Sequence, residues 1–314
     1  MTAQETESPM VSLIVGGDSM IGAALAAALK RDGAPVRATT RRRDSTAPDR
    51  PWLDLADEAG WSEAMMDSVG TAYLCAAVAR LNDCARDPAG SQRVNTTNAV
   101  AFAEWLMKRG VPVVFLSTNQ VFDGHRPRQR ADAPVSPRNV YGRQKAEAEA
   151  GILAAATRNG GHAAVLRLTK VIHPGMPLFD GWMADLRRGV PITPFQDMSL
   201  APVTADVVVR TLRAIGERRG EGIYQLSAAD DVSYAKAATH IARRIGADPG
   251  LVRPVSQAST GALLETPPRY TSMATTRVSA EFGIAIPDSL AAVDSVLALA
   301  LSQQSRSNDG AGHG

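Results

Sequence analysis

The chain has very few cysteines, because Cys75 and Cys84 are the only two among its 314 residues. Two thiols nine positions apart form neither a disulfide framework nor a familiar metal-binding pattern. The histidines, such as His125 and His162, also lack ligand spacing, so we expect no metal site. This sparing use of cysteine predicts a reducing, cytoplasmic setting.

A strong excess of charge and long hydrophobic runs are also missing. The net charge of +2 gives no electrostatic reason to expect nucleic acid as a partner. No stretch approaches the roughly 18 apolar residues of a membrane span, so no membrane partner is expected. The first nine residues include Glu5 and Glu7 but no apolar segment, which argues against a signal peptide.

What is present is the composition of an ordinary soluble globular protein, 45% hydrophobic and 21% charged. A length of 314 residues predicts one large or two modest domains. The last residues, 302–314, are rich in Ser, Gln, Asn and Gly, and we expect them to form a disordered tail.

A glycine-containing turn follows the first predicted strand. Residues 10–15 predict a buried strand and residues 23–30 an alanine-rich helix, with GGDSMIG (residues 16–22) between them. Strand, glycine turn and helix are the context of a dinucleotide-binding fingerprint, whose helix start binds pyrophosphate. Ser19 stands where a glycine is usual, and its hydroxyl could donate to the phosphate; the alternative is a turn without a ligand. The predicted cofactor-binding residues here are Gly16, Asp18, Ser19, Met20, Ile21 and Gly22.

The second predicted strand, residues 36–40, ends in three arginines, Arg41, Arg42 and Arg43. In dinucleotide folds an acidic residue at this point binds the adenosine ribose of NAD, whereas an arginine accommodates the 2′-phosphate of NADP. Guanidinium groups suit phosphate geometry. We therefore expect Arg41 and Arg42 to bind NADP in preference to NAD; the alternative is a solvated basic loop.

Further strands and helices alternate up to residue 118. Residues 53–55 predict a third strand, with Asp54 and Leu55 beside the adenine, and residues 73–78 predict a fourth. A helix over residues 94–108 leads to a strand over residues 113–118. This alternation predicts a parallel, doubly wound α/β sheet of the Rossmann type. The small residues that end the fourth strand leave room for a cofactor ribose: Ala76, Ala77 and Val78.

A tyrosine and a lysine lie four positions apart at the start of the next predicted helix. Residues i and i+4 share one helix face, so Tyr141 and Lys145 point the same way. A nearby ammonium group lowers the pKa of a phenol and makes it a better general acid for a carbonyl oxygen. Thr118, at the end of the preceding strand, could hydrogen-bond that same oxygen. The pair alone also occurs by chance in long helices.

With these motifs the chain resembles the extended short-chain dehydrogenase/reductase family, and within it the dTDP-4-dehydrorhamnose reductase branch. STNQVFDG (residues 117–124) is similar to that branch's STDYVFDG, and PRNVYGRQKAEAE (residues 137–149) to its Pro-x-Asn-Val-Tyr-Gly-x-x-Lys-x-x-x-Glu. LRLT (166–169), APVTADV (201–207) and GIYQLS (222–227) are similar to its later segments. The similarity extends over about residues 10 to 290.

The resemblance implies an NADPH-dependent reductase of a keto group on a nucleotide-activated sugar. Tyr141 would protonate the ketone oxygen, Lys145 would lower the pKa of Tyr141 and hold the nicotinamide ribose, and Thr118 would orient the oxygen. Two alternatives stay open: an epimerase with tightly bound NAD, and a non-catalytic NADP-binding regulatory subunit. A homodimer is also expected.

The two residues after Thr118, which are Asn119 and Gln120, distinguish this chain from related enzymes with another chemistry. Nucleotide-sugar 4,6-dehydratases carry Asp-Glu here as acid and base, and amides cannot exchange protons in that way, so dehydration is disfavoured. Gln120 also departs from the reductase branch's tyrosine and is a weak candidate for contact with the substrate.

The carboxy-terminal part is expected to form a smaller substrate domain. We expect residues 1–168 to form the NADP-binding domain, with a helix near 205–219 returning to it, and residues 169–301 to form mainly the substrate domain. Lys170 and Arg187 are weak candidates for binding a substrate phosphate or carboxylate, because both could equally be solvated surface side chains.

Overall fold

A computed structural model describes residues 10–260 and 268–311 of the chain. Within it the chain divides into two compact units. The first unit consists of Met1–Val121, Val135–Arg167 and Val209–Tyr224; the second consists of Phe122–Pro134, Leu168–Val208 and Gln225–Gly314.

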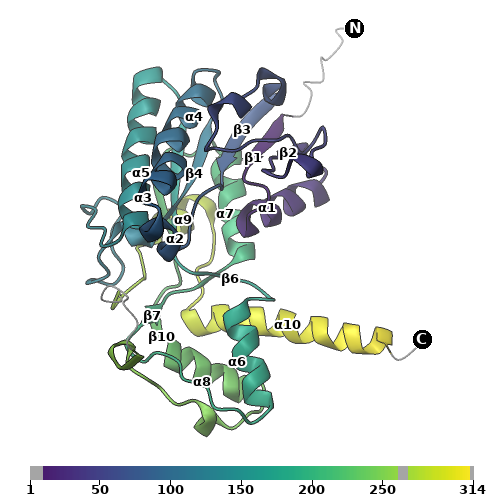
Figure 1. The fold of residues 1–314 in the computed structure, drawn as a ribbon, viewed down its shortest axis with the longest axis vertical. Coiled ribbons are helices and arrows are strands. Elements are labelled where there is room, and N and C mark those ends of the chain that lie inside the picture. Colours follow the sequence, from purple (N-terminus) through teal and green to yellow (C-terminus); the bar gives the residue numbers. More distant parts are fainter. Residues whose placement is uncertain (1–9, 261–267, 312–314) are drawn as a thin grey trace. The chain divides into compact units, whose positions relative to one another are not determined.

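The first unit is built on a six-stranded sheet with the strand order β2-β1-β3-β4-β5-β9 (Figure 1). The pairs β1–β2, β1–β3 and β3–β4 are parallel. Neighbouring parallel strands cannot be joined by a tight hairpin, so each pair requires a crossover connection, and the helices supply these connections. The strands are β1 (Val11–Val15), β2 (Val36–Ala38), β3 (Val69–Leu74), β4 (Val113–Thr118), β5 (Ala163–Leu168) and β9 (Gly222–Leu226).

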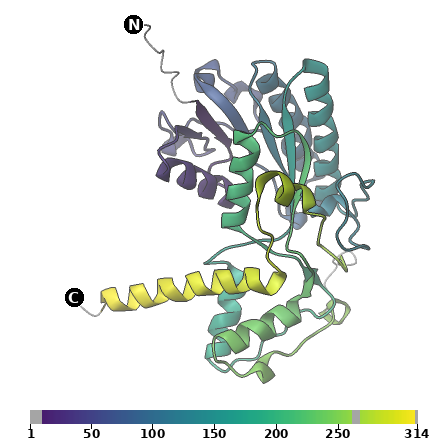
Figure 2. The same cartoon turned by 180° about the vertical axis from the view of Figure 1, so that it is seen from behind.

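Helices cover both faces of this sheet, as the two opposite views show (Figures 1 and 2). On one face, α4 (Asn98–Met107) and α5 (Val140–Asn159) pack on alternate strand residues in one buried apolar cluster. On the other, α1 (Met20–Arg31) is joined to α7 (Ala205–Glu217) by an ion pair between Asp32 and Arg213. The fold is therefore the doubly wound α/β arrangement expected from the alternating pattern.

Local sequence signals fix the helix that carries Tyr141 and Lys145. The Asn139 side chain accepts a hydrogen bond from Gly142 N at 2.7 Å and so caps the first turn of α5. Gly160, with φ of +60°, ends the helix in the left-handed conformation that glycine adopts most easily.

Two predicted strands differ from the structure. Residues 53–55 form no strand: Trp52 makes a single bridge to Thr40, and the buried side chains of Leu53 and Leu55 are held in irregular chain. The fourth predicted strand, residues 73–78, is shifted, because β3 begins at Val69 and ends at Leu74. Apolar residues suggested a strand in both places, but the hydrogen bonds of a sheet depend on partner strands that are far away in sequence.

The predicted helix over residues 94–108 is divided in the structure. A short helix α3 (Pro88–Gln92) and a π-helical turn, η4 (Arg93–Thr97), precede α4. The first unit also contains α2 (Leu81–Arg86) and the short 3₁₀ turns η1 (Arg43–Ser45), η2 (Glu58–Gly60), η3 (Glu63–Met66) and η5 (Asn119–Val121).

The second unit has small sheets and its own apolar core. Strand β6 (Val171–Ile172) pairs in parallel with β8 (Val203–Thr204), and β7 (Ser199–Leu200) pairs antiparallel with β10 (Val232–Ser233). Its helices and turns are α6 (Pro177–Arg187), α8 (Tyr234–Arg244), η6 (Pro249–Leu251), η7 (Gln257–Thr260), α9 (Thr276–Phe282) and α10 (Ser289–Ala311). Trp182 belongs to this core and stacks on Phe179 with ring centroids 5.7 Å apart.

One segment lies outside the expected domain limits, because Phe122–Pro134 belongs to the second unit although it precedes residue 169. Val209–Tyr224, which contains most of the helix expected near residues 205–219, belongs to the first unit. Helix α10 continues through Ala311, where a disordered tail was expected from residue 302, and residues 312–314 lie outside the described residues. No helix in the described ranges has the length and apolar character needed to cross a membrane.

Candidate functional site

The glycine turn between β1 and α1 has no room for side chains at its key positions. Gly16 has φ of +88°, and a Cβ there would lie 2.7 Å from the backbone nitrogen of Ala76. A Cβ on Gly22 would lie 2.3 Å from the Gly16 carbonyl oxygen. The turn is therefore held tightly between the start of α1 and the chain that follows β3, as a dinucleotide-binding turn requires.

Ser19 is part of this turn rather than a free donor. Its hydroxyl donates to the Gly16 carbonyl at 2.7 Å and accepts from Gly22 N at 3.1 Å, which makes it the N-cap of α1. This differs from the expectation that the hydroxyl donates to a phosphate, because the proton is used inside the turn.

Backbone donors remain at the helix start. In the described part of the chain, the N–H groups of Asp18, Met20 and Ile21 have no hydrogen-bond partner. Free N–H groups at the positive end of a helix bind anionic phosphates well. The turn thus fits a dinucleotide pyrophosphate through its backbone.

The end of β2 is bound directly to the glycine turn. Gly16 N donates to Thr39 Oγ1 at 3.0 Å, and Gly17 N donates to the Thr39 carbonyl at 2.9 Å. Thr40 Oγ1 donates to Asp18 Oδ2 at 2.7 Å. Sequence reasoning did not select either threonine, although two hydroxyl residues at a strand end are a signal that could have been used.

The three arginines after β2 do not behave alike. The Arg43 guanidinium lies 3.8 Å from the ring centroid of Trp52, a cation–π contact that occupies it. The side chains of Arg41 and Arg42 are exposed. Arg50, which sequence reasoning did not select, forms an ion pair with Asp18, with Nη2 and Oδ1 2.6 Å apart.

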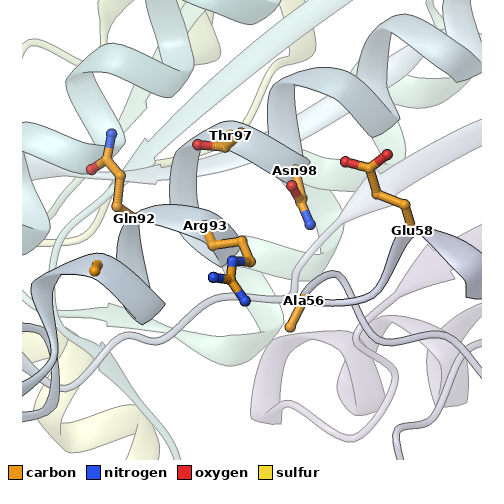
Figure 3. A pocket seen from close by; sticks show the side chains of 7 residues that line it. Ala56, Glu58, Gln92, Arg93, Thr97 and Asn98 are labelled. Carbon is orange, nitrogen blue, oxygen red and sulfur yellow. The ribbon is translucent and has the colours of Figure 1, made fainter.

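The residues predicted to lie beside the adenine sit in the irregular segment after Trp52. Asp54 Oδ1 accepts from Ala56 N at 2.9 Å, and the Leu55 carbonyl accepts from the Asn98 side chain at 2.5 Å. Next to this segment lies a cavity of about 520 Å³ between the loop and the turns around η4 (Figure 3). It is lined by Ala56, Glu58, Ala89, Gln92, Arg93, Thr97 and Asn98, and by none of the residues predicted to be catalytic.

The chain after β3 is held by a buried asparagine that sequence reasoning missed. Asn95 Oδ1 accepts from Val78 N at 2.8 Å, and its Nδ2 donates to the Val78 carbonyl at 2.9 Å. The same Nδ2 donates to Gln144 Oε1 at 2.8 Å. This network fixes the predicted ribose-facing segment, Ala76 to Val78, against the helix that carries Tyr141.

Thr118 is the last residue of β4 and is buried. Its Oγ1 accepts a hydrogen bond from Gln120 N at 3.2 Å, so the hydroxyl proton remains to be donated elsewhere. Tyr141 and Lys145 lie in the first two turns of α5, which packs on β4. The first unit therefore brings the three predicted catalytic residues into two neighbouring elements.

Lys145 is almost fully buried, and its Nζ lies 3.7 Å from the ring centroid of Phe115. Burial lowers the pKa of Lys145 to about 7, although Glu149 and Cys75 act in the opposite direction. Burial also raises the pKa of Tyr141, and neighbouring Cys84 adds to the effect. The direction at Tyr141 is opposite to the lowering expected from Lys145, because burial of the phenol itself disfavours the charged phenolate.

A buried ion pair lies one turn beyond Lys145. Glu149 faces Arg167 of β5, with Nη2 and Oε2 2.7 Å apart, and both side chains are buried. Arg167 Nε is 3.1 Å from both carboxylate oxygens, and Ser117 of β4 donates its hydroxyl to the same carboxylate. The pair ties α5 to the two strands below it.

The predicted substrate residues are placed differently. Gln120 Oε1 accepts from Asn139 Nδ2 at 2.8 Å, which connects Gln120 to the N-cap of α5. Lys170 and Arg187 are exposed side chains of the second unit, and their substrate role stays a prediction. The described residues contain no group of three or more side chains able to hold a metal ion.

Comparison with known proteins adds independent information. A family model described as the RmlD substrate binding domain matches residues 10–301. The dTDP-4-keto-6-deoxy-D-glucose reductase of Streptomyces niveus is 28% identical over 272 residues, which cover 82% of this chain and 86% of that protein.

Solved structures share the same fold. The dTDP-4-dehydrorhamnose reductase of Bacillus anthracis str. Ames in complex with NADP gives a TM-score of 0.80 at 16% identity, covering 92% of this chain and 99% of that one. The UDP-glucose 4-epimerase of Thermotoga maritima with UDP-glucose gives 0.77 at 18% identity, covering 93% and 100%. At these identities the likeness establishes the fold, and it does not separate a reductase from an epimerase.

Proposed function

Because the chain belongs to the RmlD substrate binding domain family, we propose that it is an NADPH-dependent reductase of a keto group on a nucleotide-linked sugar. The observation that carries this proposal is the placement of Thr118 at the end of β4 and of Tyr141 and Lys145 on one face of α5. These three groups are a hydroxyl donor, a phenol and an ammonium group, which together can protonate and orient a carbonyl oxygen.

The reaction needs one hydride and one proton. When bound, the reduced nicotinamide supplies the hydride to the carbonyl carbon. Tyr141 gives its phenolic proton to the carbonyl oxygen, and the Thr118 hydroxyl, whose oxygen already accepts from Gln120 N, donates to that oxygen and orients it. Lys145 then stabilises the phenolate that remains. Tyr141 is protonated at neutral pH, the form that a proton donor needs, although burial raises its pKa and makes the phenol a weaker acid in the coenzyme-free chain.

NADPH is proposed as the coenzyme, with NAD as the alternative. The free N–H groups of the glycine turn suit the pyrophosphate, and the arginines after β2 suit a 2′-phosphate. Arg41 and Arg42 directly follow the strand end that is hydrogen-bonded to this turn, which supports the preference.

Gln120 supports reduction over dehydration and offers the substrate a neutral donor. Asn139 Oδ1 accepts from Gly142 N, so its Nδ2 must donate, and Gln120 must therefore present Oε1 to it. The Gln120 amide N–H₂ group, which has no partner in the described chain, is left to donate to the sugar. An amide in this position cannot supply the acid and base that elimination of water requires.

The proposal is tested by measuring NADPH oxidation with purified protein and a panel of nucleotide-linked keto sugars, dTDP-4-keto-6-deoxyhexoses first. We expect one NADPH to be consumed for each keto sugar reduced. Turnover of a sugar without net oxidation of NADPH would instead support the epimerase. Absence of turnover with every sugar, together with tight NADPH binding, would support a non-catalytic subunit.

We also propose that Lys170 and Arg187 contact the substrate, that the chain forms a homodimer and that it acts in the cytoplasm.

A further inference from the structure

An ion pair joins the glycine turn to a segment that lies outside the arginine run. Arg50 Nη2 is 2.6 Å from Asp18 Oδ1, while Thr40 Oγ1 donates to Asp18 Oδ2 at 2.7 Å. Burial alone would raise the pKa of Asp18, but hydrogen bonds from Thr40 and Arg50 outweigh it and hold that pKa below its ordinary value. Asp18 is therefore a charged carboxylate at neutral pH, and Arg50 is its cationic partner.

Arg50 reaches this position because the chain folds back after β2. Ala47 and Arg50 exchange backbone hydrogen bonds at 3.0 and 2.8 Å, which forms a tight reversal. The returning chain pairs with Thr40, whose N–H donates to the Pro51 carbonyl at 3.0 Å. The reversal thus places a guanidinium beside the strand end although Arg50 comes nine positions after Arg41.

The pair lies where a dinucleotide fold distinguishes NADP from NAD. The residue at the end of the second strand contacts the adenosine 2′ position. In this chain the end of that strand, Thr39 and Thr40, is hydrogen-bonded to Gly17 and Asp18 of the turn. Asp18 and Arg50 therefore border the 2′ position from the side of the glycine turn.

The neighbouring arginines are less well placed for this role. Arg43 is stacked on Trp52. Arg41 and Arg42 are exposed, and ordering an exposed arginine side chain on a ligand costs conformational entropy. Arg50 is already ordered by the Asp18 carboxylate. A phosphate can replace a carboxylate as a bidentate partner of a guanidinium group.

We propose that Arg50 binds the 2′-phosphate of the coenzyme and that Asp18 competes with this phosphate for Arg50. Binding of NADPH exchanges one ion pair for another, and Asp18 then faces a second anion. Asp18 accordingly limits the preference for NADPH and permits binding of NADH, because the ribose hydroxyls of NADH can donate hydrogen bonds to a carboxylate. The inference rests on the proposed coenzyme.

Binding of 2′,5′-ADP and 5′-AMP, which differ only in the 2′-phosphate, is measured by calorimetry with the full chain and tests the inference without turnover. Charge-assisted hydrogen bonds contribute about 1.5–3 kcal/mol, which corresponds to roughly ten- to hundredfold in affinity. Arg50→Gln should weaken binding of 2′,5′-ADP by at least about tenfold and leave the affinity for 5′-AMP within about twofold. Arg50→Lys keeps the charge but loses the bidentate geometry, so its loss should be smaller, and Asp18→Asn should bind 2′,5′-ADP several-fold more tightly.

Lys30→Gln is the matched control, because it removes a cation of similar exposure from another ion pair of the same length, Lys30–Asp49 at 2.6 Å. Both ligands should bind it as they bind the wild-type chain. A wild-type preference for 2′,5′-ADP that persists in Arg50→Gln would overturn the inference alone. A wild-type chain that binds both ligands equally would overturn the proposed coenzyme as well.

Discussion

At the scale of single residues, the burial of Lys145 sets the electrostatics of the candidate site. Its ammonium group lies over the Phe115 ring rather than in water. Burial lowers the pKa of this lysine to about 7, and the carboxylate of Glu149 recovers only part of the charged form. Burial of a lysine in this way destabilises the coenzyme-free protein.

This cost predicts a pH dependence of stability. The pKa of Lys145 is about 7 in the folded chain and 10.5 ordinarily, so between these values the unfolded chain binds a proton that the folded chain does not. The contribution of Lys145 to the stability of the coenzyme-free chain should therefore rise as pH increases from 7 towards 10, and the comparison with Lys145→Met isolates it from the opposite effect of buried Cys75 and Tyr141, whose pKa values are raised. Relative to Lys145→Met, the rise should be a few kcal/mol, at about 1.4 kcal/mol per pH unit.

Urea unfolding of both chains at pH 7 and pH 9.5 measures this difference. Lys30→Met serves as control, since Lys30 is half exposed and should follow the wild type. Parallel pH profiles for wild type and Lys145→Met would contradict the lowered pKa.

At this scale, the residue types of the candidate site were predictable from the sequence, whereas their hydrogen-bond and ion-pair partners were not. Local spacing was enough to predict that Tyr141 and Lys145 share a helix face, because i and i+4 are neighbours in any helix. The orientation of the Ser19 hydroxyl into its own turn, and the roles of Asn95 and Arg50, depend on residues far away in sequence. A single sequence carries no local signal for such contacts.

At the scale of elements, α5 is the helix that positions the candidate site. Its start is capped by Asn139, and its middle is held by the buried Glu149–Arg167 pair between α5 and β5. Breaking a buried pair leaves one charge unpaired, whereas replacing both charges with apolar groups removes that penalty.

We therefore expect Glu149→Gln to lose about 3–5 kcal/mol of the free energy of unfolding. The double substitution Glu149→Leu with Arg167→Met should be markedly more stable than the single one. Glu147→Gln, an exposed change on the same helix, is the control and should cost less than about 1 kcal/mol. Equal losses for the single and double variants, measured by urea unfolding, would show that the pair is not coupled.

Elements with local signals were predicted closely, and elements that depend on pairing were not. The strand over residues 113–118 and the helix that begins near Tyr141 have the predicted bounds because hydrophobic runs and caps define them. Residues 53–55 look like a strand, yet they form no bridge, and only the preceding residue, Trp52, is bridged to Thr40. The π-helical turn before α4 has no recognisable sequence signature.

At the scale of the whole molecule, coenzyme binding should couple to stability. A ligand that binds only the folded state stabilises it by RT ln(1 + [L]/Kd), about 2.7 kcal/mol at a hundred times Kd. If the first unit prefers NADPH, thermal unfolding in equal concentrations of NADPH and NADH should give the higher midpoint with NADPH. Identical midpoints would contradict the preference.

The family, the doubly wound fold and the class of enzyme, an NAD(P)-dependent oxidoreductase, were predicted from sequence and are confirmed by the comparisons. Two specific motifs, at residues 117–124 and 137–149, were sufficient for this. The sugar itself was not predictable, because the second unit has short strands and irregular segments whose residues carry no chemical motif.

The central claim is that Tyr141 protonates a keto sugar while NADPH supplies the hydride. The most direct measurement compares NADPH oxidation by wild type and Tyr141→Phe with the keto sugar that the panel identifies, with NADPH binding measured on the same samples. Loss of a general acid should lower turnover by about 10²–10⁴-fold, while NADPH binding stays within about twofold. A Tyr141→Phe chain that oxidises NADPH at the wild-type rate would contradict the account.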